Sequence, residues 1–329
     1  MAEKRKSGAT AGEEPGDKVL RARVTERTRS QYNTMNVHLK KWLQSSVPGA
    51  VVGDVIQLPL KTSTCKSFLA SVTVKRKRGD ASGKTNIPNS YSTVNGYINA
   101  IKFLHKEGKV EIPKDLDDML KAFANGYKRQ VAKFKENGTM SMQEGKIPLT
   151  TEAYRFLAEK ALSSSKYGAP VHCFLVLSWN LMTRAESTAS IRFDHISWQG
   201  DALVIKIGRT KNDQEGKMAW PRHVYANPFE PTICPILSLG LLVFTLGARR
   251  EGMSALVFDV NVKESFASWL HRICVDEDER MTEIGVSAKD IGTHSLRKGV
   301  STALSNSPAG PQAVSVWLRA GWSLGSVQG

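Results

Sequence analysis

A histidine and an arginine three positions apart, His294 and Arg297, stand in the segment GTHSLRKGVSTAL (residues 292–304). Thr293 is a favourable N-cap for a helix that starts at His294. The spacing then places both side chains on one side of the first turn. Cationic side chains beside the unpaired backbone N–H groups of a helix N-terminus form an anion site, and phosphate suits such a site. A packed histidine beside a surface arginine would give the same letters, so the pair alone is weak evidence.

A second arginine, Arg184, stands in the segment LSWNLMTRAESTASIRFDHISW (residues 177–198). It follows a predicted apolar helix and precedes another apolar turn, so its guanidinium needs a partner in the folded chain. The planar guanidinium fork matches the oxygens of a phosphate group. The alternative is a buried ion pair, for which Glu186 and Asp194 are the candidate partners.

Two further side chains have the chemistry to contact a bound ligand. Lys211 lies near the tip of a predicted hairpin in GRTKNDQEGK, where its long amine can extend to a ligand, although most lysines at such tips are only solvated. Trp322 follows a predicted helix end at Gly321, and its indole N–H needs a partner if the ring is buried. Most tryptophans at such a position anchor the core instead.

The elements that must position these residues begin with a helical first half. Hydrophobic residues recur at three- and four-residue steps after Thr25, as in Tyr32, Met35 and Leu39. Further helices are predicted over residues 61–72, 90–108 and 114–135. Residues 1–24 are polar and charged, and we expect a disordered tail there, because burial would not offset the entropy of ordering it.

A basic stretch with two glycines interrupts these helices. Residues 74–86, VKRKRGDASGKTN, are predicted to form a flexible loop. Its Lys75, Arg76, Lys77 and Arg78 are expected to contact phosphates, and a nuclear import signal is the alternative.

The second half is predicted to mix helices with a small sheet. A polar linker over residues 136–150 separates it from a basic helical domain at 25–135. Apolar periodicity predicts helices at 151–162, 170–182, 235–247, 262–274, from His294 onward and at 310–322. Strand-like patterns at 195–208 and 217–225 flank a polar tip, which predicts a hairpin. The fold class is therefore mainly α with a small β-hairpin sheet (α+β).

The charge of the chain is unevenly distributed. Lys and Arg number 46 against 31 Asp and Glu, and up to Lys146 the count is 27 against 14. A basic domain gains affinity for a polyanion by releasing the counterions condensed on its phosphates. A solvated basic face that aids solubility is the alternative.

Several classes of protein are disfavoured by the same sequence. The four cysteines lie far apart without a CxxC pair, so neither a zinc site nor a disulfide framework is expected, and we expect buried, reduced thiols. The charged N-terminus does not match a signal peptide. The most apolar stretch, residues 233–247, is interrupted by Pro235 and Gly240 and is too short to favour a membrane span.

Taken in order, the candidate residues resemble the active-site set of the tyrosine recombinases, the phage-integrase type of DNA breaking and joining enzymes. The matching positions are Arg184, Lys211, His294, Arg297 and Trp322. MTRAESTASIR is similar to the first arginine box of the family, THSLRKG to its HxxR box, and RAGWS to the segment that carries histidine or tryptophan. The resemblance covers residues 25–329, and the segment from KNDQEG to PILSLG is similar to recombinases of eukaryotic mobile elements such as the cryptons.

The resemblance implies a domain organisation and a partner. Residues 25–135 would be an all-helical core-binding domain and residues 151–329 a recombinase catalytic domain, with duplex DNA clamped between them. A tetramer on DNA is the assembly that the chemistry of the family usually requires. No metal or other cofactor and no membrane are implied, and the location would be the nucleus in a eukaryote and otherwise intracellular.

The resemblance also implies roles for the residues. The two arginines with His294 and Trp322 would bind the non-bridging oxygens of the scissile phosphate and offset the charge of the transition state. Lys211 would donate a proton to the leaving 5′ oxygen, with Lys217 as the second choice.

Two departures from the family pattern are visible. The acidic residue expected three positions after Arg184 is replaced by Ser187, and Glu186 lies one position earlier. The nucleophilic tyrosine is expected about nine residues after Trp322, which falls beyond Gly329, and we do not propose Tyr225 as a substitute. We therefore expect a truncated recombinase, incomplete at its C-terminus and inactive as given, rather than a decayed element.

Two other functions are kept as alternatives. The first is a non-catalytic DNA-binding remnant of the same fold. The second is a helical interaction protein whose basic face is incidental and does not bind DNA.

Overall fold

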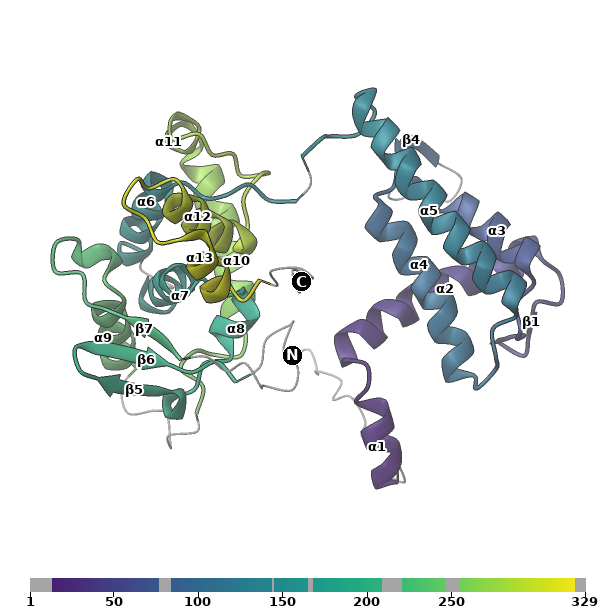
Figure 1. The fold of residues 1–329 in the computed structure, drawn as a ribbon, viewed down its shortest axis with the longest axis horizontal. Coiled ribbons are helices and arrows are strands. Elements are labelled where there is room, and N and C mark those ends of the chain that lie inside the picture. The colour runs from purple at the N-terminus through teal and green to yellow at the C-terminus, as the bar shows by residue number, and fades with distance from the viewer. Residues whose placement is uncertain are drawn as a thin grey trace, which may run out of the picture. The chain divides into compact units, whose positions relative to one another are not determined.

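The computed structural model describes residues 14–76, 84–143, 145–164, 168–208, 221–246 and 255–322. The chain divides into two compact units, Met1–Glu144 and Gly145–Gly329. This division falls inside the stretch 136–150 that the sequence predicts as a linker. Figure 1 shows one unit drawn in purple to teal and the other in teal to yellow.

The described part of the N-terminal unit contains five helices and two short hairpins. The helices are α1 (Pro15–Arg21), α2 (Glu26–Ser46), α3 (Thr62–Ser71), α4 (Tyr91–Glu107) and α5 (Lys114–Glu136), and the strands are β1 (Val51–Val52), β2 (Val55–Ile56), β3 (Val74–Arg76) and β4 (Lys84–Pro88). The Thr25 hydroxyl caps α2 by accepting a hydrogen bond from the N–H of Thr28 at 3.3 Å. The predicted helices after α1 are thus present.

The core of the N-terminal unit lies where α2, α3, α4 and α5 pack together. Leu43, Phe68 and Leu116 are fully buried in it. The buried His105 ties α4 to the chain before α3: its Nδ1–H donates to the carbonyl oxygen of Ile101 at 2.9 Å, and its Nε2 accepts from the N–H of Leu60 at 3.3 Å. Apolar packing from the predicted helix faces therefore forms this unit.

Three parts of this unit differ from the sequence-based prediction. The tail predicted at 1–24 contains the helix α1, which has Pro15 at its start, Asp17 in its first turn and Arg21 in its last, as the helix dipole favours. β1 and β2 form an unpredicted hairpin whose turn residues Gly53 and Asp54 both have positive φ. The predicted loop 74–86 is a pair of antiparallel strands at its described ends, β3 and β4.

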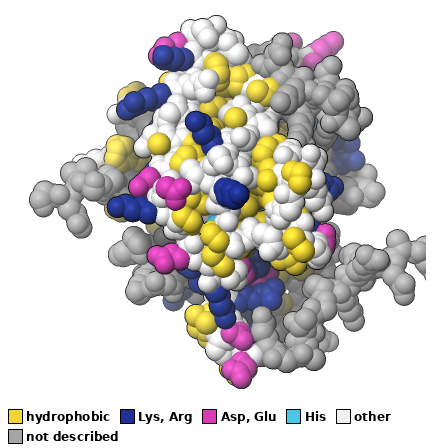
Figure 2. Space-filling model, turned by 90° about the vertical axis from the view of Figure 1, so that its right-hand side faces the viewer, with side chains coloured by type: hydrophobic (Ala, Val, Ile, Leu, Met, Phe, Trp, Pro, Cys, Tyr) yellow, Lys and Arg dark blue, Asp and Glu magenta, His cyan; other side chains and the backbone are white. Residues whose placement is uncertain are grey.

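Basic side chains do not gather into one patch on the visible face of this unit. Figure 2 shows Lys and Arg side chains spread among hydrophobic and uncharged ones, with Asp and Glu side chains between them. Several cations are also paired: Lys40 with Asp54 at 2.5 Å and Lys102 with Asp117 at 2.6 Å.

The described part of the C-terminal unit combines eight α-helices and two short 3-10 helices with a three-stranded antiparallel sheet. The α-helices are α6 (Thr151–Leu162), α7 (Gly168–Asn180), α8 (Ala185–Ala189), α9 (Pro235–Leu246), α10 (Val262–Asp276), α11 (Asp278–Glu283), α12 (Thr293–Ser305) and α13 (Ala313–Ala320), and the strands are β5 (Ile196–Gln199), β6 (Ala202–Ile205) and β7 (Arg222–Val224). The sheet has the order β5-β6-β7, with Ile196 opposite Ile205 and Leu203 opposite Val224.

Helix α7 is the centre of this unit. Every residue from Val171 to Trp179 is buried, and α6, α9, α10 and α12 all contact the helix. Figure 1 shows α7 surrounded by these helices. The C-terminal end of α7 leads directly to Arg184, so the most buried helix of the unit positions the first predicted site residue.

The predicted fold class, mainly helical with a small hairpin sheet, is confirmed. Helices α8 and α11 were not predicted; both are short, and their amphipathic patterns are too brief to be recognised. The hairpin tip predicted between β6 and β7, residues 209–220, lies outside the described residues.

Candidate anion-binding site

Helix α12 carries the His294 and Arg297 pair. The helix begins at Thr293, one residue earlier than predicted, so the N-cap position belongs to Gly292 and the predicted cap at Thr293 is wrong. The hydroxyl of Ser295 accepts a hydrogen bond from the N–H of Gly292 at 3.0 Å, which closes the first turn. His294 is exposed, whereas Arg297 is only 6% exposed. The two side chains therefore have different surroundings.

A close backbone contact fixes where α12 lies. The N–H of Leu149 donates to the carbonyl oxygen of Ser295 at 3.0 Å, and the N–H of Ile147 donates to that of Asp290 at 2.8 Å. A Cβ atom on Gly299 would overlap the carbonyl oxygen of Leu149 and come within 2.8 Å of the Trp179 ring. Glycine at this position thus lets α12 approach the core closely enough to place Arg297.

Arg297 is held in place by the segment that carries Trp322. Its Nη2 donates to the carbonyl oxygen of Ala320, and its guanidinium carbon lies 5.2 Å from the centre of the Trp322 ring. Its Nε is buried without a hydrogen-bond partner. Burial, followed by the charges of Arg184 and Arg222, lowers the pKa of Arg297 to about 10.

Arg184 occupies the N-cap position of α8 and is half-buried. Hydrogen bonds among buried hydroxyl groups stabilise the turn before it. The hydroxyl of Thr188 is hydrogen-bonded to that of Ser178 at 3.0 Å and to that of Thr183 at 2.7 Å. Arg184, 113 residues earlier in the sequence, lies near enough to Arg297 for its charge to contribute to the lowered pKa of Arg297.

Glu186 and Asp194, the candidate partners of Arg184 in the sequence, each form an ion pair with a further cation. Glu186 forms an ion pair with Lys263 at 3.3 Å, and Asp194 forms one with Arg192 at 2.9 Å. Ser187, at the position where the family carries an acid, is buried.

The site contains two arginines that the sequence did not single out. Arg222 on β7 donates from Nη1 to the carbonyl oxygen of Leu181 at 2.5 Å. Arg319 on α13 donates to the carbonyl oxygens of Asn180 and His223, at 2.8 and 2.9 Å. Alternation along β7 could have revealed Arg222, because it shares a strand face with the buried Val224.

The described residues therefore place Arg184, Arg297 and Trp322 together, with Arg222 and Arg319 beside them. Trp322 is partly buried and packs against the core, immediately after Gly321 ends α13 with a φ of 63°. His294 is in the adjoining turn of α12 and exposed.

Other predicted site residues lie partly or wholly outside the described chain. Lys211 and its alternative Lys217 fall in residues 209–220, and Lys77 and Arg78 fall in residues 77–83. Lys75 is exposed on β3, and the backbone of Arg76 ends that strand.

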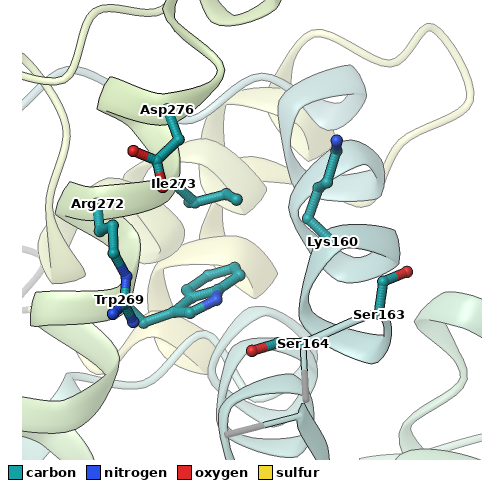
Figure 3. Close-up of a pocket in the computed structure, with 7 residues that line it drawn as sticks. All are labelled: Lys160, Ser163, Ser164, Trp269, Arg272, Ile273 and Asp276. Atoms are coloured by element: carbon teal, nitrogen blue, oxygen red, sulfur yellow. The ribbon is translucent and has the colours of Figure 1, made fainter. Parts of the chain in front are cut away.

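A separate cleft of about 360 Å³ lies between α6 and α10. Figure 3 shows Lys160 and Ser163 on one side and Arg272 and Asp276 on the other, with Trp269 at its base. Lys160 is paired with Glu277, and the cleft walls carry charges of both signs. This cleft therefore does not favour an anion, unlike the arginine cluster.

Within the described ranges, no group of three or more His, Cys, Asp or Glu side chains is arranged to hold a metal ion. The four cysteines are buried free thiols. No described helix is long and apolar enough to cross a membrane.

The fold is similar to that of solved recombinases. The integrase of the Tn1549 transposon in complex with transposon right-end DNA has 14% identity and a TM-score of 0.56, and the match covers 93% of this chain and 90% of that one. The XerH site-specific recombinase bound to difH substrate has 14% identity and a TM-score of 0.54, over 89% and 73% of the chains. The Tn1549 integrase with circular intermediate DNA has 13% identity and a TM-score of 0.54, over 93% and 90%.

Sequence comparison alone finds no relative. No protein-family model matches the chain, and no curated protein matches it. The similarity to the solved recombinases thus establishes a shared fold over most of the chain.

Proposed function

We propose that this chain binds duplex DNA and holds a phosphate diester at the arginine cluster, as a tyrosine recombinase of the kind carried by mobile elements such as the cryptons. The observation that carries the proposal is the convergence of Arg184, Arg297 and Trp322 in one place. These residues come from three separate sequence motifs. The recombinase fold supports the same function.

In this proposal Arg184 and Arg297 bind the non-bridging oxygens of the phosphate. A preorganised guanidinium stabilises charge that develops in the transition state without a cost of reorganisation at that moment. Arg297 is preorganised because the hydrogen bond to Ala320 and the ring of Trp322 restrain its guanidinium. Its pKa of about 10 keeps it cationic at neutral pH.

His294 and Lys211 complete the proposed site. His294, which is exposed in the first turn of α12, would donate a hydrogen bond to the bound phosphate. Lys211 is proposed as the general acid for the leaving 5′ oxygen. It matches the lysine that donates this proton in the tyrosine recombinases that the sequence resembles. We assign no nucleophilic tyrosine among the described residues, so the proposal for this chain concerns binding and charge stabilisation.

The N-terminal unit is proposed to be the core-binding domain. It carries most of the positive charge, because Lys and Arg outnumber Asp and Glu by 27 to 14 up to Lys146. Attraction to phosphates of any sequence would supply its affinity.

Equilibrium binding to a short random-sequence duplex at several salt concentrations tests the proposal. We expect the logarithm of the association constant to fall linearly with the logarithm of salt concentration. Arg297→Gln should weaken binding by about tenfold or more, since a hydrogen bond to a charged group contributes roughly 1.5–3 kcal/mol. Arg280→Gln is the matched control, because Arg280 is exposed on α11 and paired with Glu283 and Glu152.

The outcomes separate the candidate functions. No affinity for duplex DNA at low salt would favour a helical interaction protein and overturn the proposal. Equal, small effects of R297Q and R280Q would show that DNA binds elsewhere, which favours a non-catalytic DNA-binding protein of the same fold.

A further inference from the structure

Arg222 is a partly buried cation whose described partners do not neutralise it. Among the described residues, its guanidinium donates from Nη1 to the carbonyl oxygen of Leu181, which satisfies a donor but supplies no negative charge. No carboxylate of the described chain forms an ion pair with it. Taking a guanidinium even partly out of water is costly unless an opposite charge compensates it.

The surroundings of Arg222 are also cationic. Its charge acts on Arg297, and the charge of Arg319 acts on it. Burial, followed by Arg319, lowers the pKa of Arg222 to about 10. In the free protein these like charges repel one another. A bound anion would offset this repulsion.

The second arm of the Arg222 guanidinium points toward the segment that carries Trp322. Its Nη2 lies 3.8 Å from where a Cβ on Gly321 would be, and Gly321 immediately precedes Trp322. Arg297 reaches the same segment through the carbonyl oxygen of Ala320. The guanidiniums of Arg222 on β7 and Arg297 on α12 therefore both approach the residues that immediately precede Trp322.

Arg319 holds β7, the strand that contains Arg222, by hydrogen bonds. It donates to the carbonyl oxygen of His223, the next residue of β7, and to that of Asn180 at the end of α7. Because carbonyl oxygens carry only partial charge, these bonds orient β7 without cancelling the charge of Arg222.

We propose that Arg222 is a third anion-binding arginine of this site, which contacts the phosphate diester of DNA beside Arg297 while Arg319 acts as a positioning residue for β7. This inference rests on the proposed function, since it assigns a further contact to the same phosphate. It also gives a role to β7, which follows the segment that contains Lys211 in the sequence.

Thermal unfolding in inorganic phosphate, against sodium chloride of equal ionic strength, tests the inference. Phosphate should raise the unfolding temperature of the wild-type chain, because a ligand that binds only the folded state stabilises it. Arg222→Gln should weaken the apparent phosphate affinity by about tenfold or more. Without phosphate it should unfold at the same temperature as wild type or a higher one, because a repulsive charge has been removed. Arg280→Gln, which removes one charge far from the site, should leave the phosphate response unchanged.

Two results would overturn the inference. One is the absence of any phosphate response in the wild-type chain. The other is an R222Q variant that unfolds more easily yet responds fully to phosphate, because Arg222 would then be only a structural tie to Leu181. If R222Q is both less stable and unresponsive, Arg222→Lys decides: a restored response supports anion binding, and an absent response rejects it.

The phosphate responses of R297Q and R222Q, together with duplex DNA binding by the wild-type chain, separate an error in the role of Arg222 from an error in the proposed function. If R297Q abolishes the phosphate response while R222Q does not, the site stands and only the role of Arg222 is wrong. If the wild-type chain does not bind duplex DNA, the proposed function itself is wrong.

Discussion

The indole ring of Trp322 covers the guanidinium of Arg297, with 5.2 Å between the guanidinium carbon and the ring centre. Arg297 lies near the start of a predicted helix, and Trp322 follows the end of another. The contact joins α12 to the residues that follow α13. This contact both restrains the cation and shields it from water.

Replacement of Trp322 should therefore depend on whether an aromatic ring is kept. We expect Trp322→Ala to lower the free energy of unfolding by about 1–3 kcal/mol, less than for a fully buried tryptophan. Trp322→Phe should cost less than about 1.5 kcal/mol, because a ring still covers Arg297. Urea unfolding measures both variants, and equal losses would show that the ring does not support Arg297.

The basic segment 75–78, which begins on β3, should contribute to the salt dependence of DNA binding. Neutralising Lys75, Arg76, Lys77 and Arg78 together should reduce the slope of log affinity against log salt by about 0.9 for each phosphate that these side chains no longer neutralise. The control neutralises four ion-paired cations of the C-terminal unit, namely Lys160, Arg192, Lys263 and Arg280. A slope that stays at the wild-type value in the fourfold variant would show that these side chains do not contact DNA phosphates.

Gly299 should not tolerate even a methyl group. Gly299→Ala is expected to cost about 1–3 kcal/mol or more, because the added Cβ meets the backbone of Leu149, which cannot rotate away. Gly240→Ala in α9 is the matched control, since no atom lies within 4 Å of the place that its Cβ would occupy. That control should be neutral or slightly stabilising, because alanine favours a helix by about 1 kcal/mol over glycine. Equal stabilities of the two variants would contradict the close approach of α12.

His172 should make the stability of the C-terminal unit depend on pH. It is fully buried in α7, and its Nε2–H donates to the carbonyl oxygen of Thr232 at 2.6 Å. Burial lowers its pKa below the ordinary value of 6.5, so below that pH the unfolded chain binds a proton more readily than the folded one. Stability is therefore complete above about pH 6.5 and falls as the pH decreases through that value.

Urea unfolding between neutral and mildly acidic pH tests this dependence. His172→Gln keeps an N–H donor but has no charge to gain, so its stability should fall less than that of wild type over this range. His271→Gln, at an exposed position of α10, serves as the control. If H172Q and wild type lose stability in parallel, His172 does not cause the effect.

The four cysteines should react slowly with a thiol reagent in the folded protein. All four are buried, and burial raises the pKa of Cys65, Cys173 and Cys274 to about 12, so little thiolate is present at pH 8. Denaturation should release four rapidly reacting thiols. A cysteine that reacts at once in the native protein would show that its part of the core opens easily.

The amphipathic helices were predictable because their burial is encoded locally. The apolar faces of α2, α4, α6 and α10 repeat at helical spacing, and their limits follow caps such as Thr25, Ser90 and Thr150. The hairpin β1–β2 and the short helices α8 and α11 were missed, because each contains too few residues for a periodic pattern to show.

The sequence alone identifies Arg184, Arg297 and Trp322 as residues with the chemistry to bind a phosphate, and it predicts the helix that carries Arg297 and the apolar helix that precedes Arg184. It could do so because residue type and helical period are local properties. Only the tertiary structure decided that Arg222 and Arg319 join them, since the partners of these arginines are backbone carbonyls 41 to 139 residues away. Carbonyl oxygens are present at every residue, so no sequence pattern marks the ones that a distant arginine will reach.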